Sequence, residues 1–237
     1  MLASGVAHEV KNPLGIIIQG VNYLEKILPV GQEDIFKALT MIKQSITRAD
    51  NIVESLIDFS RLTNLNLQPL DINSILEDSL ILVKQNLQSK QIEVVKELKQ
   101  EIPKVLIDKN RMEQVFINIL LNAIQAIPAS GTIFIRSYDM VLEEVKNGAH
   151  GIGENRFKAK EKVVIVEIED TGVGISEENI KKIFDPFFTT KKIGEGLGLG
   201  LSICRNIIDI HGGVIEIKSQ VGKGTTVIVT LGIVPGR

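Results

Sequence analysis

The sequence predicts an α+β protein of two domains: an antiparallel helical hairpin over residues 1–64 and an α/β sandwich over residues 65–237. Apolar residues recur at alternating steps of three and four in the first part, which is a helical period. Helical and strand patterns then alternate along the second part. Residues 61–70 lose the helical period and contain Pro69, so we place the domain boundary there.

Each helix of the hairpin carries one apolar seam with heptad spacing, which is typical of helices that pack at a shallow angle. The first seam consists of Val6, Val10, Leu14, Ile17, Val21, Leu24 and Leu28, before Pro29 and Gly31. The second consists of Ile35, Leu39, Ile42, Ile46, Ala49, Val53 and Leu56. Two such helices leave one face of each in water, so we expect a homodimer in which two hairpins form a four-helix bundle.

The second domain is expected to place helices on one face of a mixed sheet. The expected elements are helix 71–88 with Asp71 or Asn73 as its cap, strands 92–98 and 104–107, helix 110–127, strands 132–138 and 162–169, helix 200–210, and strands 213–219 and 225–231. Residues 139–161 contain several glycines and many charges, which favours a surface hairpin or a mobile loop without chemistry.

The composition limits the classes of partner. A hydrophobic content of 44% is ample for packed cores, and a net charge of −2 argues against nucleic acid as a partner. No apolar run approaches the roughly 18 residues of a membrane span, and no signal peptide is recognisable, so we expect no membrane contact within this chain. Its one cysteine, Cys204, is expected in the core, and a cytoplasmic location fits. The helical pattern is already under way at Leu2, which is compatible with the removal of upstream sequence.

A histidine near the start has a carboxylate beside it and an amide one helical turn away. His8 and Asn12 are four residues apart and therefore share a helix face, while Glu9 lies next to the imidazole. Pro13 lacks an N–H, so it would leave the Glu9 carbonyl unpaired and bend the helix. Taken alone, a His-Glu pair on an amphipathic helix is more typical of solvated surface.

Three further segments contain residues suited to a nucleotide. Asn118 and Asn122 share a helix face and offer amide oxygens to Mg²⁺, although they could also bridge a helix contact. Asp170, followed by Gly172 and Gly174, can accept a hydrogen bond from an exocyclic amine where glycines allow close approach; an ordinary tight turn is the alternative.

The strongest of these segments alternates glycine with larger residues immediately before a helix. Its glycines are Gly194, Gly196, Gly198 and Gly200. Unshielded backbone amides and the positive end of a helix dipole favour phosphate binding. The segment is not a Walker loop, and the chain has neither a dinucleotide fingerprint nor the motifs of eukaryotic-type protein kinases. Residues 184–191 add three phenylalanines and Lys191, which could dock on a ligand and reach a terminal phosphate, or could simply end a helix in the core.

Five segments resemble, in order, the sequence boxes of bacterial sensor histidine kinases. Residues 7–14 resemble the phosphoacceptor box, 118–123 the asparagine box, 170–175 the adenine-binding box, 184–191 the phenylalanine-rich box and 194–201 the glycine-rich lid. The resemblance covers essentially the whole chain, and His-Glu-x-x-Asn-Pro with Phe-Phe-Thr-Thr-Lys is similar to the nitrogen-regulation branch. It implies a dimerisation and phosphotransfer hairpin followed by an ATP-binding domain of the gyrase, chaperone and MutL type.

The resemblance implies that His8 attacks the γ-phosphate of Mg-ATP, while Glu9 orients the imidazole and takes its proton. The phosphoryl group would then pass to an aspartate in the receiver domain of a response regulator. Asn122 would hold Mg²⁺, Asn118 would lie close to the phosphates and Asp170 would bind the adenine amine. The other implied nucleotide contacts are Gly172, Gly174, Lys191, Gly194, Gly196, Gly198, Gly200 and Thr225. Asn12 suggests a second activity, dephosphorylation of the regulator, with the amide orienting the attacking water.

Some positions depart from the pattern of the family. Gln125 stands where a basic residue is common, Val227 replaces a common aromatic residue, and the 139–161 segment is longer than usual. Two other functions compete: a dimeric scaffold that binds nucleotide without phosphotransfer, and an ATP-driven conformational machine. Proteins of the second kind lack a box like that of His8 and usually have a carboxylate at the place of Asn118.

Overall fold

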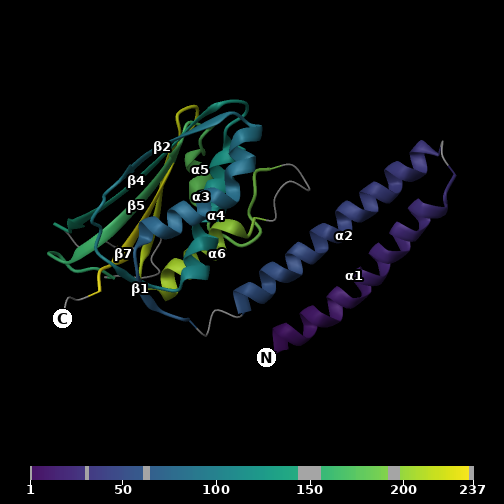
Figure 1. Cartoon of the computed structure of the whole chain (residues 1–237), viewed down its shortest axis with the longest axis horizontal. Helices are drawn as coiled ribbons and strands as arrows, with labels where there is room; N and C mark the ends of the chain where they lie inside the picture. The colour runs from purple at the N-terminus through teal and green to yellow at the C-terminus, as the bar shows by residue number, and fades with distance from the viewer. Residues whose placement is uncertain (1, 30–31, 61–64, 144–155, 192–197, 235–237) are drawn as a thin grey trace. The chain divides into compact units, whose positions relative to one another are not determined.

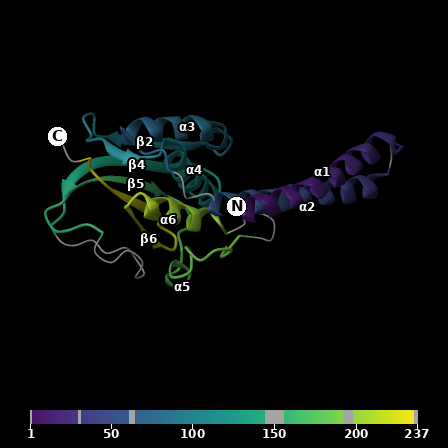
Figure 2. The same ribbon diagram turned by 90° about the horizontal axis from the view of Figure 1, so that it is seen from below.

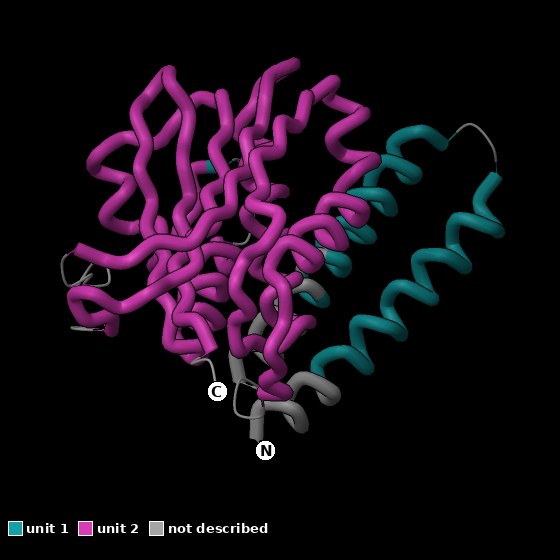
Figure 3. Tube along the Cα trace, turned by 60° about the vertical axis from the view of Figure 1, so that its left-hand side comes forward, with its two compact units in different colours: residues 1–64, 191–197 teal, residues 65–190, 198–237 magenta. Residues whose placement is uncertain are grey.

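The computed structural model describes residues 2–29, 32–60, 65–143, 156–191 and 198–234. The chain divides into two compact units (Figure 3): residues 1–64 with 191–197, and residues 65–190 with 198–237. Each unit is described by itself below. Within the described ranges, no helix is long and apolar enough to cross a membrane.

The first unit is an antiparallel helical hairpin (Figure 1), as the heptad seams predict. Helix α1 spans Leu2–Ile27 and continues through Pro13, and α2 spans Glu33–Ser60. Two acidic residues in the first turn of α2 suit the positive end of the helix dipole. The seam residues Val21, Leu39 and Ile46 are buried between the two helices.

The second unit is an α/β sandwich. Its strands are β1 Gln68–Leu70, β2 Ile92–Leu98, β3 Val105–Ile107, β4 Gly131–Val141, β5 Lys162–Asp170, β6 Val214–Gln220 and β7 Gly224–Gly232. Its helices are α3 Ile72–Ser89, α4 Lys109–Ala126, α5 Glu177–Ile180 and α6 Gly200–Ile210. The main sheet has the order β2-β4-β5-β7-β6, in which only β2 and β4 pair in parallel.

Helices α3, α4 and α6 cover one face of this mixed sheet (Figures 1 and 2), and the core lies between the two layers. Ile135 on β4 is directly opposite Ile168 on β5, and both are buried there together with Phe116 of α4. The expected sandwich is therefore confirmed. Strand β1 and helix α5 were not predicted, because three or four residues are too few to show a period.

Residues 139–161 join β4 to β5, which pair antiparallel, so the hairpin alternative is confirmed, but the expectation of an exposed loop is wrong at both ends of the segment. Strand β4 continues to Val141, and Leu142 and Phe157 are buried against Val163, Ile165, Val214 and Ile228. The alternation along β5 places Val163 and Ile165 on the sheet face opposite to Ile168, so this cluster covers the second face. Residues 144–155 lie outside the described part of the chain.

Candidate functional site

Asp170 ends strand β5 and faces the layer of helices. Its side chain is only 5% exposed, and its Oδ1 accepts a hydrogen bond of 2.8 Å from the N–H of Gly172. Burial raises the pKa of this carboxyl group, although hydrogen bonds from the backbone N–H groups of Gly172 and Thr225 act in the opposite direction. A carboxylate has about four acceptor positions, so Asp170 can still accept an N–H of a ligand.

The glycines after Asp170 fit a loop that is clamped by the protein itself. A Cβ on Gly172 would lie 2.7 Å from the carbonyl oxygen of Ala126, and the N–H of Val173 donates to that oxygen at 3.0 Å. Gly174 has a φ of +71°, and a Cβ there would lie 2.1 Å from the carbonyl oxygen of Gln220. Close packing by α4 and the β6–β7 turn therefore requires both glycines and fixes this loop beside Asp170.

A polar row crosses the sheet beside Asp170. Thr225 on β7 is paired with Asp170 on one side and with Ser219 on the other, so the three side chains share one face. The hydroxyl oxygens of Ser219 and Thr225 are 2.8 Å apart. Ser219 has no signal in the sequence, because its place beside Thr225 depends on strand pairing.

Asn118 and Asn122 on α4 both lie beside the first residue of α6. A Cβ on Gly200 would be 3.9 Å from Cγ of Asn118 and 3.9 Å from Nδ2 of Asn122. Leu199, which precedes α6, has no side chain that could cap the first N–H groups. These N–H groups, the positive end of the dipole and two amide side chains meet at one place, an arrangement suited to an anion with an accompanying cation.

The aromatic-rich segment is joined to the start of α6 through its backbone. The N–H of Phe187 donates to the carbonyl of Gly198 at 3.0 Å, and a Cβ on Gly198 would lie 2.5 Å from the carbonyl oxygen of Phe188. Gly198 and Phe187 both have positive φ values, +67° and +68°. Phe184 is buried under the Arg205 guanidinium, whereas Phe187 is exposed. The alternative of a core residue therefore describes Phe184 but not Phe187.

Other predicted residues are not placed together with this cluster. His8 and Glu9 lie within helix α1, but their side chains are outside the described part, and Asn12 is exposed. Lys191 is half-buried and belongs to the first unit. Gly194 and Gly196 lie outside the described residues.

A histidine that the sequence analysis did not single out ties α6 to α4. His211 Nε2 accepts the N–H of Asp108 at 3.0 Å, and Nδ1 lies 2.6 Å from the Ile207 carbonyl, to which it can only donate. The imidazole is therefore neutral. Asp108 itself caps α4 and accepts the N–H of Asn66 at 2.9 Å.

We expect His211 to make the second unit sensitive to mild acid. Burial lowers the pKa of His211 below 6.5, against the opposing effects of the Ile207 carbonyl and Asp108. Below pH 6.5 the unfolded chain therefore binds more protons than the folded chain does. The contribution of His211 to the free energy of unfolding is fully present above pH 6.5, and it decreases as the pH falls from there towards the pKa of the folded state. Thermal melts between pH 7.5 and about 5.5 should show this decrease. His211→Gln, which keeps an acceptor for Asp108, should reduce the pH dependence, and His150→Gln should not; equal slopes in all three proteins would contradict the assignment.

Comparison with known proteins agrees with this geometry. Residues 107–235 match the family model of the histidine kinase-, DNA gyrase B- and HSP90-like ATPases, and residues 1–65 match the His Kinase A phospho-acceptor domain. The sensor histidine kinase ZraS of Escherichia coli (strain K12) is 36% identical over 225 residues, which are 95% of this chain and 43% of ZraS. The signal transduction histidine-protein kinase AtoS of the same strain is 35% identical over 99% of this chain and 35% of its own length.

Solved structures show the same fold. The histidine kinase ThkA in complex with the response regulator protein TrrA is similar with a TM-score of 0.66 at 30% identity, over 99% of this chain and 61% of that one. Full-length ShkA in complex with AMPPNP has a TM-score of 0.73 at 22% identity, over 99% of this chain and 46% of ShkA. The chain spans less than half the length of the curated relatives ZraS and AtoS. It belongs to the histidine kinase-, DNA gyrase B- and HSP90-like ATPase family, as the transmitter region of a sensor histidine kinase.

Proposed function

We propose that this chain phosphorylates its own His8 from Mg-ATP and passes the phosphoryl group to an aspartate of a response regulator. The observation that carries the proposal is the meeting of Asn118, Asn122 and the uncapped start of α6 within the matched ATPase region. The match of residues 1–65 to a phospho-acceptor domain supports the proposal of an acceptor for the phosphoryl group of that nucleotide. We assign residues 1–64 to dimerisation and phosphotransfer, and residues 65–237 to ATP binding.

In the proposed site, Asp170 accepts the adenine amine and the N–H groups at the start of α6 contact the phosphates. The remaining proposed contacts are Gly172, Gly174, Lys191, Gly194, Gly196, Gly198, Gly200 and Thr225. The amide oxygen of Asn122, with Asn118 beside it, is a suitable ligand for Mg²⁺, because this hard cation prefers oxygen ligands and the phosphates would supply further ones. The described residues contain no cluster of three or more His, Cys, Asp or Glu that could bind a metal without the nucleotide. When bound, Mg²⁺ would neutralise charge on the phosphates.

The proposed chemistry needs neutral imidazole as the nucleophile. A ring nitrogen of His8 attacks the γ-phosphorus, the bond to the bridging oxygen breaks and ADP leaves with that electron pair. Glu9 holds the other ring N–H, which fixes the tautomer, and takes the proton that the imidazole loses. Glu9→Ala should therefore lower the rate of autophosphorylation more than it lowers the affinity for ATP.

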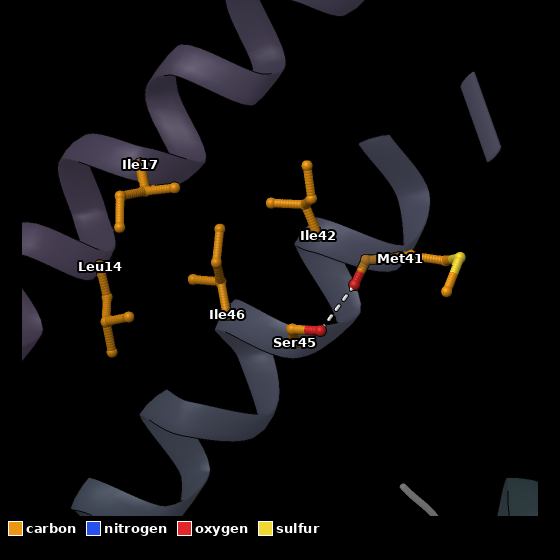
Figure 4. Close-up of a pocket in the computed structure, with 6 residues that line it drawn as sticks. All are labelled: Leu14, Ile17, Met41, Ile42, Ser45 and Ile46. Atoms are coloured by element: carbon orange, nitrogen blue, oxygen red, sulfur yellow. Dashed lines mark hydrogen bonds between the residues drawn. The ribbon is translucent and has the colours of Figure 1, made fainter. Parts of the chain in front are cut away.

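We propose a second copy of the chain as the partner of the hairpin. Several seam residues stay exposed within one hairpin: Val10 at 38%, Ile17 at 48% and Ile42 at 42%. Leu14 and Ile17 from α1 and Ile42 and Ile46 from α2 line a shallow apolar groove (Figure 4). Because the exposed residues continue the heptad seam, a second hairpin would bury them in a four-helix bundle. The cytoplasmic location and the nitrogen-regulation-like branch stay predictions.

The proposal is tested by incubating the chain with γ-labelled ATP and Mg²⁺. We expect label on the protein that is stable in alkali and lost in acid, as for a phosphorylated imidazole, and that does not form when a chelator removes Mg²⁺. Nucleotide binding without label would indicate a scaffold. Release of phosphate without labelled protein would indicate an ATPase, and either result would contradict the proposal.

Replacing Asn12 with alanine should abolish phosphatase activity toward a phosphorylated receiver domain and spare autophosphorylation. Asn12 is exposed on α1, one turn beyond His8, where its amide can orient a water on the partner's phosphoaspartate. Loss of an oriented water should slow hydrolysis by about 100-fold or more, so that the label on the receiver domain persists. The measurement is loss of label from the receiver domain, with the exposed Asn22→Ala of the same helix as the control. If Asn12→Ala also removed autophosphorylation, the assignment would be wrong.

A further inference from the structure

Ser219 makes three hydrogen bonds at the end of the polar row. Its hydroxyl oxygen accepts the N–H of Ile175 at 2.8 Å and lies 2.9 Å from the carbonyl oxygen of Gly224. Its third neighbour, at 2.8 Å, is the hydroxyl oxygen of Thr225. One half-buried side chain thus holds the loop after Asp170, the β6–β7 turn and Thr225.

The directions of these bonds follow from the number of hydrogens. A serine hydroxyl has one hydrogen to donate and two lone pairs. The Gly224 carbonyl can only accept, so the hydrogen of Ser219 is used there. The contact between the two hydroxyls must then be a donation from Thr225 to Ser219. Thr225 is only 7% exposed and keeps only lone pairs for any other neighbour.

Thr225 is directly opposite Asp170 in the β5–β7 pair, so two acceptors lie next to each other on the face that the proposed nucleotide would contact. A ligand or bridging water that reaches either group must donate a hydrogen. A 6-amino purine meets this requirement, whereas the oxygen of a 6-oxo purine would face two acceptors. We infer that Ser219 is a specificity-determining positioning residue, which fixes Thr225 as an acceptor and thereby favours ATP over 6-oxopurine nucleotides. The inference rests on the proposed ATP site.

The test compares binding of ATP and inosine triphosphate, which has oxygen in place of the 6-amino group, by calorimetry with Mg²⁺ present. The native chain should bind ATP at least about 100-fold more tightly, since mispaired polar groups at a buried site are strongly rejected. In Ser219→Ala, Thr225 can rotate its freed hydrogen toward the 6-oxygen. The ratio of the affinity for ATP to the affinity for inosine triphosphate should therefore fall by about tenfold, which corresponds to the loss of one hydrogen bond. Ser219→Thr keeps the hydroxyl and should keep the native ratio.

The control is Ser89→Ala, which removes an exposed hydroxyl that donates to the Asn86 carbonyl at the end of α3. It should change neither affinity. A thermal melt checks folding, and if Ser219→Ala does not fold, Ser219→Cys serves instead, because a thiol of similar size is a poor partner for Thr225. If the Ser219 variants bound both nucleotides more weakly by the same factor, the role of Ser219 would be merely structural. That result would overturn the inference but would not contradict the proposed ATP site. Failure of the native chain to bind ATP would instead overturn the proposed function and the inference with it.

Discussion

Replacing His8 with alanine is expected to abolish acid-labile labelling by γ-labelled ATP while leaving ATP affinity unchanged. The imidazole is the proposed nucleophile, and alanine offers no group that could form a bond to phosphorus. Alanine is also the best helix former, so α1 should persist. The proposed nucleotide contacts at Asn118, Asn122 and Asp170 belong to the other unit and are not altered. The measurement pairs labelling with calorimetric ATP binding on the same protein.

The chain offers a matched control, because it contains three histidines. His150→Ala makes the same chemical change and should retain full labelling. His211 is excluded as an acceptor on structural grounds: one ring nitrogen accepts the N–H of Asp108 and the other donates to the Ile207 carbonyl, so no lone pair is available for attack. Persistent acid-labile label in His8→Ala would place the phosphoacceptor elsewhere and contradict the proposal.

The periodic parts of this fold could be predicted from the sequence. The heptad seams predicted the hairpin, and the bounds predicted for α3, α4 and α6 were within one or two residues of the observed ones. The same helical period explains why Asn118 and Asn122 could be placed on one face of α4. Local spacing carries this information because residues three or four apart in a helix are neighbours whatever the rest of the chain does.

Contacts between distant segments could not be predicted in this way. The bond between Asp108 and His211 joins residues 103 apart, and Ser219 meets Ile175 across 44 residues. Both depend on which strands and helices become neighbours, and no spacing within one element encodes that choice. Phe157 was hidden for a different reason: it is a single buried aromatic in a stretch of charges and glycines, so it produces no period. His211 and Ser219 thus hold parts of the proposed site in place, whereas Phe157 packs on the other face of the sheet, and none of the three is proposed to contact the ligand.

Replacing Gly224 with alanine is expected to destabilise the second unit by about 3 kcal/mol or more and to weaken ATP binding by at least about 100-fold. Gly224 has a φ of +102°, and a Cβ there would lie 1.8 Å from the carbonyl oxygen of Asp170. No rotamer can relieve this contact, because the backbone fixes the position of the Cβ and the oxygen is itself a backbone atom. Strand β7 must move away from the end of β5, which displaces Asp170 and breaks the bond between Ser219 and the Gly224 carbonyl.

Gly222→Ala separates this clash from backbone strain alone. Gly222 is in the same turn with a φ of +79°, but a Cβ there would have no atom within 4 Å. Its cost should be only that of a left-handed residue with a side chain, about 1–2 kcal/mol, with ATP affinity nearly unchanged. Urea denaturation and calorimetric ATP binding measure both effects. If the two variants lost the same stability and affinity, a positive φ alone would explain Gly224; a loss confined to Gly224→Ala means that the contact between β7 and the carbonyl of Asp170 is what keeps this carboxylate in place.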